Sequence, residues 1–207
     1  MSDLQCPARI LVCRHGEAAF SRSDVLTEEA GFLTALGRQQ ADALGARLAQ
    51  ERVAAVYTST LARAQETGER LGSLLGLAPL SVEGAQEFAI EDFVGRPVDD
   101  NSGVAEVYRR WVSGDLSVGC PGAETGAEIV DRFTTAVDAL ADRHRGETIV
   151  LVSHGGVMSL AITHQLVNAS PTLVHQHLLP NCAVVTVEVD ADGWRLVGPW
   201  PGLAIGD

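Results

Sequence analysis

Two histidines follow two apolar runs in the same way, and this repeated pattern is the most informative feature of the sequence. The first run ends in Cys13 and is followed by Arg14-His15-Gly16-Glu17, and the second ends in Val152 and is followed by Ser153-His154-Gly155-Gly156. Each short apolar run predicts a buried strand. In a parallel α/β sheet, ligands bind at the carboxyl ends of the strands. We therefore expect both imidazoles and an arginine to meet there, where they could bind and attack a phosphoryl group.

His15 is the candidate nucleophile of this set. A neutral imidazole can attack phosphorus, and a phosphohistidine intermediate divides one difficult displacement into two easier steps. Gly16 removes a side chain where a phosphate would approach, and the guanidinium of Arg14 suits phosphate oxygens. We expect His154, positively charged when phosphate binds, to stabilise the equatorial oxygens. The alternative for both histidines is a structural role at a strand end.

Arg63 lies in a segment, Tyr57–Thr67, that predicts a strand end followed by the start of a helix near Leu61. Ser59 or Thr60 is the expected N-cap of that helix. A cation is disfavoured in the first turn, where the helix dipole is positive, so Arg63 is expected to serve a bound anion. The alternative is a solvated surface arginine.

The elements around these residues alternate between strand and helix through most of the chain. We expect strands at Arg9–Cys13, Ala54–Tyr57, Leu80–Val82 and Thr148–Ser153, a hairpin of Ala183–Val189 with Trp194–Val197, and helices at Thr34–Gln50, Leu61–Leu75, Val104–Val112, Thr125–His144 and Val157–Val167. This alternation predicts an α/β fold, with a mainly parallel central sheet and helices on both faces. With 207 residues, 46% of them hydrophobic, one domain over 1–207 is expected, with a small cap insertion at 96–123.

The charge and cysteine content exclude several classes of protein. A net charge of −12 argues against nucleic acid and anionic membranes as partners. The chain has no lysine, which excludes a P-loop lysine, a Schiff-base lysine and a Ser-Lys dyad. Four cysteines are too few for a disulfide framework, and neither a signal peptide nor an apolar stretch long enough to cross a bilayer is evident. We therefore predict a cytoplasmic protein.

Together, the two strand-His-Gly motifs and the Arg63 segment resemble the histidine phosphatase superfamily, also called phosphoglycerate mutase-like. Three further motifs extend the resemblance through most of the chain. Leu33–Ala41 is similar to the family's Leu-Thr-x-x-Gly-x-x-Gln-Ala helix start, Pro121–Thr125 to its Pro-Gly-Gly-Glu-Ser, and Asn181-Cys182-Ala183 to its Asn-Cys-Ser. Each motif is short, but their order and spacing are specific.

The resemblance implies a phosphate pocket of Arg14, His15, Arg63 and His154, with His15 phosphorylated. It also implies a separate carboxylic acid that protonates the leaving oxygen. In one branch of the family the acid directly follows the second histidine, but this chain has Gly155 there. The candidate is instead Glu87, which begins a segment that keeps an aromatic residue and a final glycine. The rival acids are Glu83, Glu91 and Asp92.

Substrate contacts are less well determined by the resemblance. Gly155 and Ser21 are expected at the phosphate, although Ala18 and Ser21 replace the threonine and asparagine of many relatives, and Arg22 is a candidate rim contact. In the cap, Tyr108, Arg109, Arg110 and Trp111 either select the substrate or belong to an ordinary amphipathic helix. The spacing of His175-Gln176-His177 is compatible with a metal pair, but no Cys or acidic partner is nearby, so a surface or packing role is expected. Neither a metal nor another cofactor is expected.

The function that these residues predict is a metal-independent phosphatase that hydrolyses small phosphomonoesters through a phosphohistidine. One alternative is a cofactor-dependent phosphoglycerate mutase, which uses the same intermediate. The other is a catalytically silent phosphate-binding module that kept the fold. The expected partner is a small phosphorylated metabolite, and a homodimer is left open.

Overall fold

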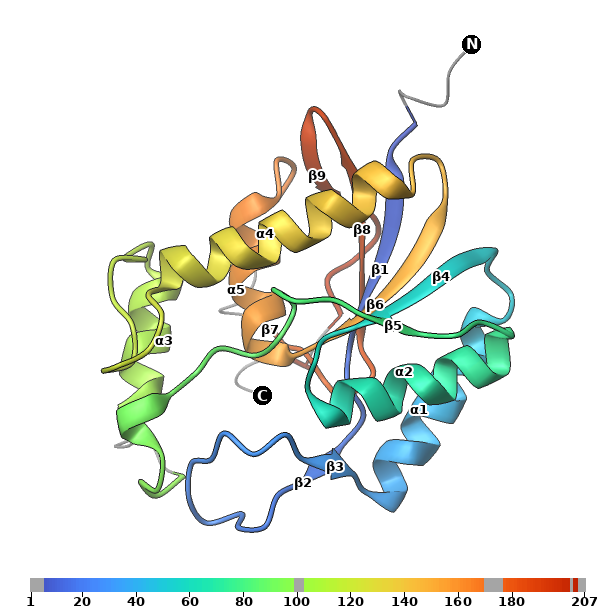
Figure 1. The fold of residues 1–207 in the computed structure, drawn as a ribbon. Coiled ribbons are helices and arrows are strands. Elements are labelled where there is room, and N and C mark those ends of the chain that lie inside the picture. Colours follow the sequence, from blue (N-terminus) through green and yellow to red (C-terminus); the bar gives the residue numbers. More distant parts are fainter. Residues whose placement is uncertain (1–5, 99–102, 170–176, 202, 205–207) are drawn as a thin grey trace.

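A six-stranded sheet with the strand order β5-β4-β6-β1-β8-β9 forms the centre of the protein (Figure 1). The computed structural model describes residues 6–98, 103–169, 177–201 and 203–204. Strands β5, β4, β6 and β1 run parallel, while β8 is antiparallel to β1 and pairs with β9 as a hairpin. The strands are β1 (Ala8–Arg14), β4 (Val53–Thr58), β5 (Leu80–Ser81), β6 (Thr148–Ser153), β8 (Val184–Asp190) and β9 (Gly193–Leu196). The predicted mainly parallel α/β sheet is confirmed.

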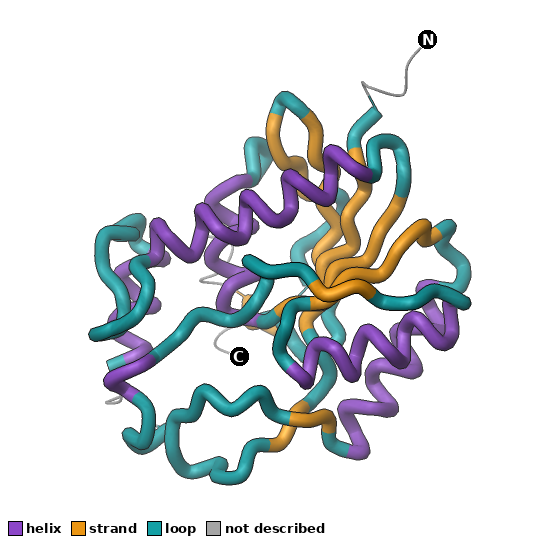
Figure 2. Tube along the Cα trace, viewed as in Figure 1, coloured by secondary structure: helices purple, strands orange, loops and turns teal. Residues whose placement is uncertain are grey.

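Helices cover both faces of this sheet, as predicted (Figure 2). One face packs against α1 (Ala35–Leu48) and α2 (Ala62–Leu75), and the other against α4 (Gly126–Arg143) and α5 (Gly155–Gln165). Helix α3 (Val104–Val112) is the predicted helix of the cap region. None of the helices in the described ranges is long and apolar enough to cross a membrane. The remaining short elements are β2 (Ala18–Ala19), β3 (Phe32–Leu33), β7 (His177–Leu178), β10 (Leu203–Ala204) and the 3₁₀ turn η2 (Glu91–Phe93).

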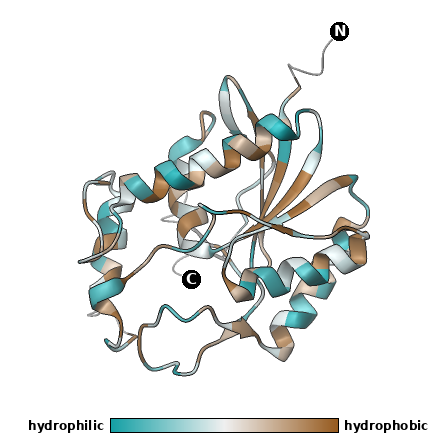
Figure 3. Cartoon of the chain, viewed as in Figure 1, coloured by the Kyte–Doolittle hydropathy of each residue, from teal (hydrophilic) through white to brown (hydrophobic). Residues whose placement is uncertain are grey.

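Alternate residues of the strands fill two separate cores. In β1, Ile10 and Val12 belong to the core under α4 and α5, whereas Leu11 and Cys13 belong to the core under α1 and α2. Successive side chains of a strand point to opposite faces, so a strand covered on both faces must be apolar throughout. Figure 3 shows this contrast between the mostly hydrophobic central strands and the mixed surfaces of the helices. The double burial explains the continuous apolar runs that precede the two histidines.

Local signals set most of the helix ends. The Thr34 hydroxyl accepts a hydrogen bond from the third residue of α1, and Thr125 forms a capping box with Glu128 at the start of α4. Gly76 closes α2 with a φ of 70°, a left-handed conformation that favours glycine.

Two local predictions are wrong. Helix α2 has Leu61 as its N-cap, with no capping side chain, in place of Ser59 or Thr60. The spacing of Leu33, Leu36, Ala41, Leu44 and Leu48 predicts one buried helix face, but Leu36 is 49% exposed while the other four are buried. Leu36 is the second residue of α1.

Candidate active site

The pairing of β1 with β6 places the two predicted histidines side by side. The strands are parallel and in register, with Arg14 opposite Ser153. His15 and His154 therefore leave the sheet at the same edge, with ring centroids 5.1 Å apart. Both side chains are buried, at 7% and 0% exposed. Strand order alone thus accounts for the meeting of residues that are far apart in the sequence.

The imidazole of His15 is held as the tautomer in which Nε2 carries the lone pair. Its Nδ1 donates to the carbonyl oxygen of Gly16 at 2.6 Å, and the Nε of Arg63 donates to Nε2 at 3.2 Å. A nitrogen that accepts a hydrogen bond carries its lone pair. Burial lowers the pKa of His15 to about 3, with Arg63 and Arg14 adding to the decrease. The ring is therefore neutral, with a lone pair on Nε2.

Arg63 is buried in the first turn of α2, at 7% exposed. Its Nη1 donates to the carbonyl oxygens of Ala30 at 2.8 Å and Glu29 at 3.3 Å, while its Nε faces His15. These carbonyls fix the guanidinium against the imidazole. The alternative of a solvated surface arginine is therefore wrong.

Arg14 and His154 each carry a buried nitrogen without a partner among the described residues. Arg14 donates from Nη1 to the carbonyl oxygen of Leu179 at 2.5 Å, but its Nε has no partner. His154 is hydrogen-bonded through Nε2 to the Ser59 hydroxyl at 2.7 Å, and its Nδ1 has no partner. An unsatisfied buried polar group costs about 1–3 kcal/mol. An anion that accepted hydrogen bonds from these two nitrogens would remove that cost.

The pKa of His154 lies well below its usual 6.5, because the ring is buried and faces Arg63, His15 and Arg14. His154 is therefore neutral without a ligand. Its predicted positive charge applies to a phosphate-bound state, in which the negative charge of the phosphate would raise the pKa of the ring.

The carboxylate of Glu87 lies at the N-terminus of α5. Its Oε2 accepts a hydrogen bond from the backbone of Gly156 at 3.0 Å, and its Oε1 accepts one from Val157 at 2.7 Å. The positive end of the helix dipole favours a carboxylate in this position. Glu87 lines the same cavity as Arg14 and His15. The structure thus brings the candidate acid to the two strand-end motifs.

The three rival acids lie elsewhere. Glu83 borders a separate groove beside β5 and α4. Glu91 and Asp92 are exposed residues of η2. None of the three lines the cavity in front of His15.

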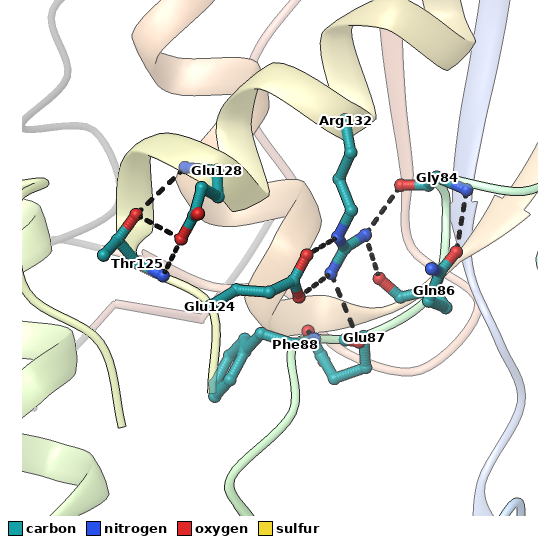
Figure 4. Close-up of polar contacts among 8 residues, drawn as sticks. All are labelled: Gly84, Gln86, Glu87, Phe88, Glu124, Thr125, Glu128 and Arg132. Carbon is teal, nitrogen blue, oxygen red and sulfur yellow. Dashed lines mark hydrogen bonds and ion pairs between the residues drawn. The ribbon is translucent and has the colours of Figure 1, made fainter. Parts of the chain in front are cut away.

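Arg132 of α4 fixes the segment that carries Glu87 (Figure 4). Its guanidinium donates to the carbonyl oxygens of Gly84 at 2.7 Å and Glu87 at 3.4 Å, and it forms an ion pair with Glu124 at 2.7 Å. Glu124 is the acidic residue of the Pro-Gly-Ala-Glu-Thr motif, so this motif acts on the site through Arg132. Sequence reasoning missed Arg132, because helical periodicity does not distinguish an arginine that binds loop carbonyls from a solvated one.

Two glycines let the loop after His15 pack against the start of α1. A Cβ on Gly16 would lie 2.5 Å from the carbonyl oxygen of Gly37, and a Cβ on Gly37 would lie 2.0 Å from that of Glu17. Asn181 holds the other side of the loop by donating to the carbonyl oxygen of His15 at 3.0 Å. The sequence predicts that Gly16 leaves room for a phosphate. The structure gives a further reason for a glycine here, which is the close packing against the backbone of Gly37.

A cavity of about 470 Å³ opens in front of His15 and extends under α3. A second cavity of about 360 Å³ adjoins it on the side of Arg63 and shares Leu26, Glu87, Phe88 and Val104 with the first. The first cavity is lined by Arg14, His15, Leu26, Glu87, Phe88, Val98, Val104, Ala105, Tyr108, Gly155, Gly156, Ser159 and Leu179. The site therefore combines a charged end with space for a small substrate.

The predicted substrate contacts differ in their placement. Gly155 lines the first cavity, and a Cβ there would lie 3.2 Å from Nε of Arg14. Ser21 is bound to the carboxylate of Glu29 and lines neither cavity. Arg22 is exposed and paired with Asp24. The structure does not bring Ser21 and Arg22 to the cavities.

Of the four candidate selectors in α3, Tyr108 alone lines the first cavity. Trp111 is 1% exposed and packs against Phe88, with ring centroids 5.0 Å apart, so it belongs to the core. Arg109 and Arg110 form exposed ion pairs within their own segment. The amphipathic-helix alternative thus describes three of the four residues.

Metal-binding groups are not gathered in the described ranges, where no cluster of three or more His, Cys, Asp or Glu side chains could hold an ion. His175 and Gln176 lie outside the described residues, and His177 begins β7.

Comparison with known proteins agrees with this geometry. The sequence pattern of the histidine phosphatase superfamily (branch 1) matches residues 10–199. The chain is 35% identical to phosphoglycerate mutase-like protein 4 of Arabidopsis thaliana, over 73% of this chain and 68% of that protein. It is 30% identical to a metal-independent phosphoserine phosphatase of the same plant, over 80% and 75%. A mycobacterial glucosyl-3-phosphoglycerate phosphatase has the same fold, with a TM-score of 0.76, 22% identity and coverage of 91% and 96%. The chain belongs to the histidine phosphatase superfamily.

Proposed function

We propose that this protein is a phosphatase that hydrolyses small phosphomonoesters through a phosphohistidine at His15, without a metal or other cofactor. The observation that carries the proposal is the state of His15: neutral, with Nδ1 bound to Gly16 and Nε2 directed at Arg63. Membership of the superfamily and the phosphatase names among its relatives support the reaction type.

In the first step, Nε2 of His15 attacks phosphorus and forms a P–N bond while the P–O bond to the leaving group breaks. Arg14, Arg63 and His154 hold the equatorial oxygens, and their charge and donors supply what a metal would otherwise supply. Glu87 enters this step as the acid and gives its proton to the leaving oxygen. An alcohol departs, and Glu87 is left as a carboxylate.

In the second step, the carboxylate of Glu87 takes a proton from water, and the resulting hydroxide attacks phosphorus. The P–N bond breaks, phosphate leaves, and His15 returns to its neutral form. The hydrogen bonds from Gly156 and Val157 suit this role because they hold the carboxylate in one orientation. Glu87 is then protonated again and ready for the next substrate.

The two alternatives make different demands on the site. A mutase must bind the carboxylate of phosphoglycerate and return the phosphoryl group to it. A silent module would bind phosphate without turnover. Such a module needs neither a neutral nucleophile nor a carboxylate in the same cavity, and this site has both. Phosphate release, measured against transfer between glycerate positions, separates the three functions.

The direct test is phosphate release from a panel of phosphomonoesters by wild type and His15→Ala. We expect His15→Ala to lose activity and keep its fold, because the substitution removes the nucleophile from a site that strands β1 and β6 still form. EDTA should leave the wild-type rate unchanged. Near wild-type turnover by His15→Ala would reject the nucleophile, and a strict metal requirement would contradict the mechanism.

The remaining expectations belong with this proposal. We place the enzyme in the reducing cytoplasm, which suits its four free cysteines. Residues 96–123 serve as the cap of a single domain and bound the leaving-group space. Homodimerisation stays a prediction that sedimentation can test.

A further inference from the structure

We infer that the natural substrates carry an uncharged, largely apolar group on the phosphate, and that phosphomonoesters bearing a carboxylate are poor substrates. This inference rests on the proposed function, because it assigns the first cavity to the leaving group. It separates this chain from relatives that are named for phosphoserine or phosphoglycerate.

The described wall of the first cavity beyond the catalytic groups is mostly apolar. Leu26, Phe88, Val98, Val104, Ala105 and Leu179 line it. Two polar side chains also reach it, Tyr108 and Ser159, and these are hydrogen-bonded to each other. Their donors and acceptors are therefore partly used, and the wall suits a hydrocarbon or aromatic group.

Among the residues that the structure describes, neither cavity has a lysine or arginine left over for a substrate carboxylate. The chain has no lysine, and every one of its arginines lies within the described ranges. Of these arginines, Arg14 alone lines the first cavity and Arg63 alone lines the second, and both face His15 and the phosphate position. A buried carboxylate without a partner keeps its full desolvation cost.

The second cavity adds negative charge on the other side of the phosphate position. Glu28 and Glu29 line it beside Arg63. Glu28 is fixed there by hydrogen bonds from the backbone of Ile90 at 2.6 Å and Glu91 at 2.7 Å. These carboxylates repel an anionic substituent that turned away from the apolar wall.

The test compares benzyl phosphate with 3-phosphoglycerate, because each carries its phosphate on a primary alcohol oxygen and the two differ in the group that enters the cavity. We expect kcat/KM to be about 100-fold higher for benzyl phosphate. A straight-chain series from methyl to butyl phosphate should gain up to about fourfold in kcat/KM per methylene, as expected for burial of hydrocarbon.

A matched pair of variants tests the missing cation. Ala105→Arg places a guanidinium on the α3 wall, and Ala105→Leu adds bulk without charge; both residues are good helix formers. We expect Ala105→Arg to reduce the preference for benzyl phosphate at least tenfold and Ala105→Leu to retain it, with melting temperatures confirming that both are folded.

Hydrolysis of both substrates with equal or reversed preference in the wild type would overturn this inference and leave the proposed function standing. Hydrolysis of neither substrate would overturn both. An Ala105→Arg variant that is folded and keeps the wild-type preference would show that a missing cation is not the cause, and would also overturn the inference.

Discussion

Replacement of Glu87 separates its proposed catalytic role from its structural one. The carboxylate accepts hydrogen bonds from Gly156 and Val157 at the start of α5. Glu87→Gln retains one oxygen for these donors, whereas Glu87→Ala retains none. At about 1 kcal/mol for each hydrogen bond, and more for a donor left unpaired, Glu87→Ala should lose about 1–3 kcal/mol of stability and Glu87→Gln about 1 kcal/mol. A loss of 1 kcal/mol lowers the melting temperature of a chain of this size by about 2–4 °C.

Catalysis should respond differently, because both variants lack the acid. We expect kcat/KM for benzyl phosphate, which needs a proton on its leaving oxygen, to fall about 10²–10⁴-fold in each variant. The same constant for p-nitrophenyl phosphate, whose leaving group departs as an anion, should fall less than about tenfold. The value of kcat/KM is the right quantity, since it reports the steps up to formation of the phosphoenzyme.

Glu91→Gln is the matched control, because it removes a rival carboxyl that lies outside the cavity. It should keep wild-type kcat/KM for both substrates. If Glu87→Gln slowed both substrates equally, Glu87 would position the site and not protonate the leaving group. If it slowed neither, the acid would have to be another residue.

Three further predictions concern the pH dependence of stability and the two glycines that follow the site histidines, Gly16 and Gly155. The pKa of His15 is about 3 in the folded protein and close to 6.5 when unfolded, so the unfolded state binds more protons between these values. The free energy of unfolding should therefore fall as pH decreases through this window, and His15 should account for about 1 kcal/mol of the fall between pH 6.5 and about pH 5.5. Urea titrations at both pH values measure this fall, which should be smaller in His15→Asn. Gly16→Ala should lower the melting temperature and the activity, because its Cβ would lie 2.5 Å from the Gly37 carbonyl oxygen; an unchanged melting temperature would refute this packing argument. Gly155→Ala should raise KM for phosphoesters with little change in melting temperature, because its Cβ would crowd Nε of Arg14 at 3.2 Å; an unchanged KM would show that Arg14 can move aside.

The sheet and the position of its chemistry were predictable because strong signals coincide. A continuous apolar run such as Ile149–Val152 predicts a strand that is covered on both faces of the sheet. Each strand-end histidine comes two residues after such a run. Parallel neighbours then place both histidines at one edge. Helix ends with their own capping signals, such as Thr125, were equally readable.

The details that failed depend on contacts between distant segments. Serine is a residue type favoured at helix N-caps, but the hydroxyl of Ser59 is hydrogen-bonded to Nε2 of His154, which directly follows β6. Trp111 lies in the predicted cap helix, but its ring packs against Phe88 and is buried in the core. Arg22 has the charge for a phosphate contact, but its neighbour Asp24 pairs with it. Residue propensity and spacing do not predict the contacts of Ser59 and Trp111, because the tertiary fold brings their partners from distant parts of the sequence.

Quenching the reaction during turnover tests the central claim most directly. Wild-type protein mixed with excess substrate, stopped within one turnover and digested for mass spectrometry should carry one phosphoryl group on His15, stable in base and labile in acid. His15→Ala treated in the same way should carry none. Steady hydrolysis by the wild type with no phosphorylated His15, or with the phosphoryl group on another residue, would contradict the account.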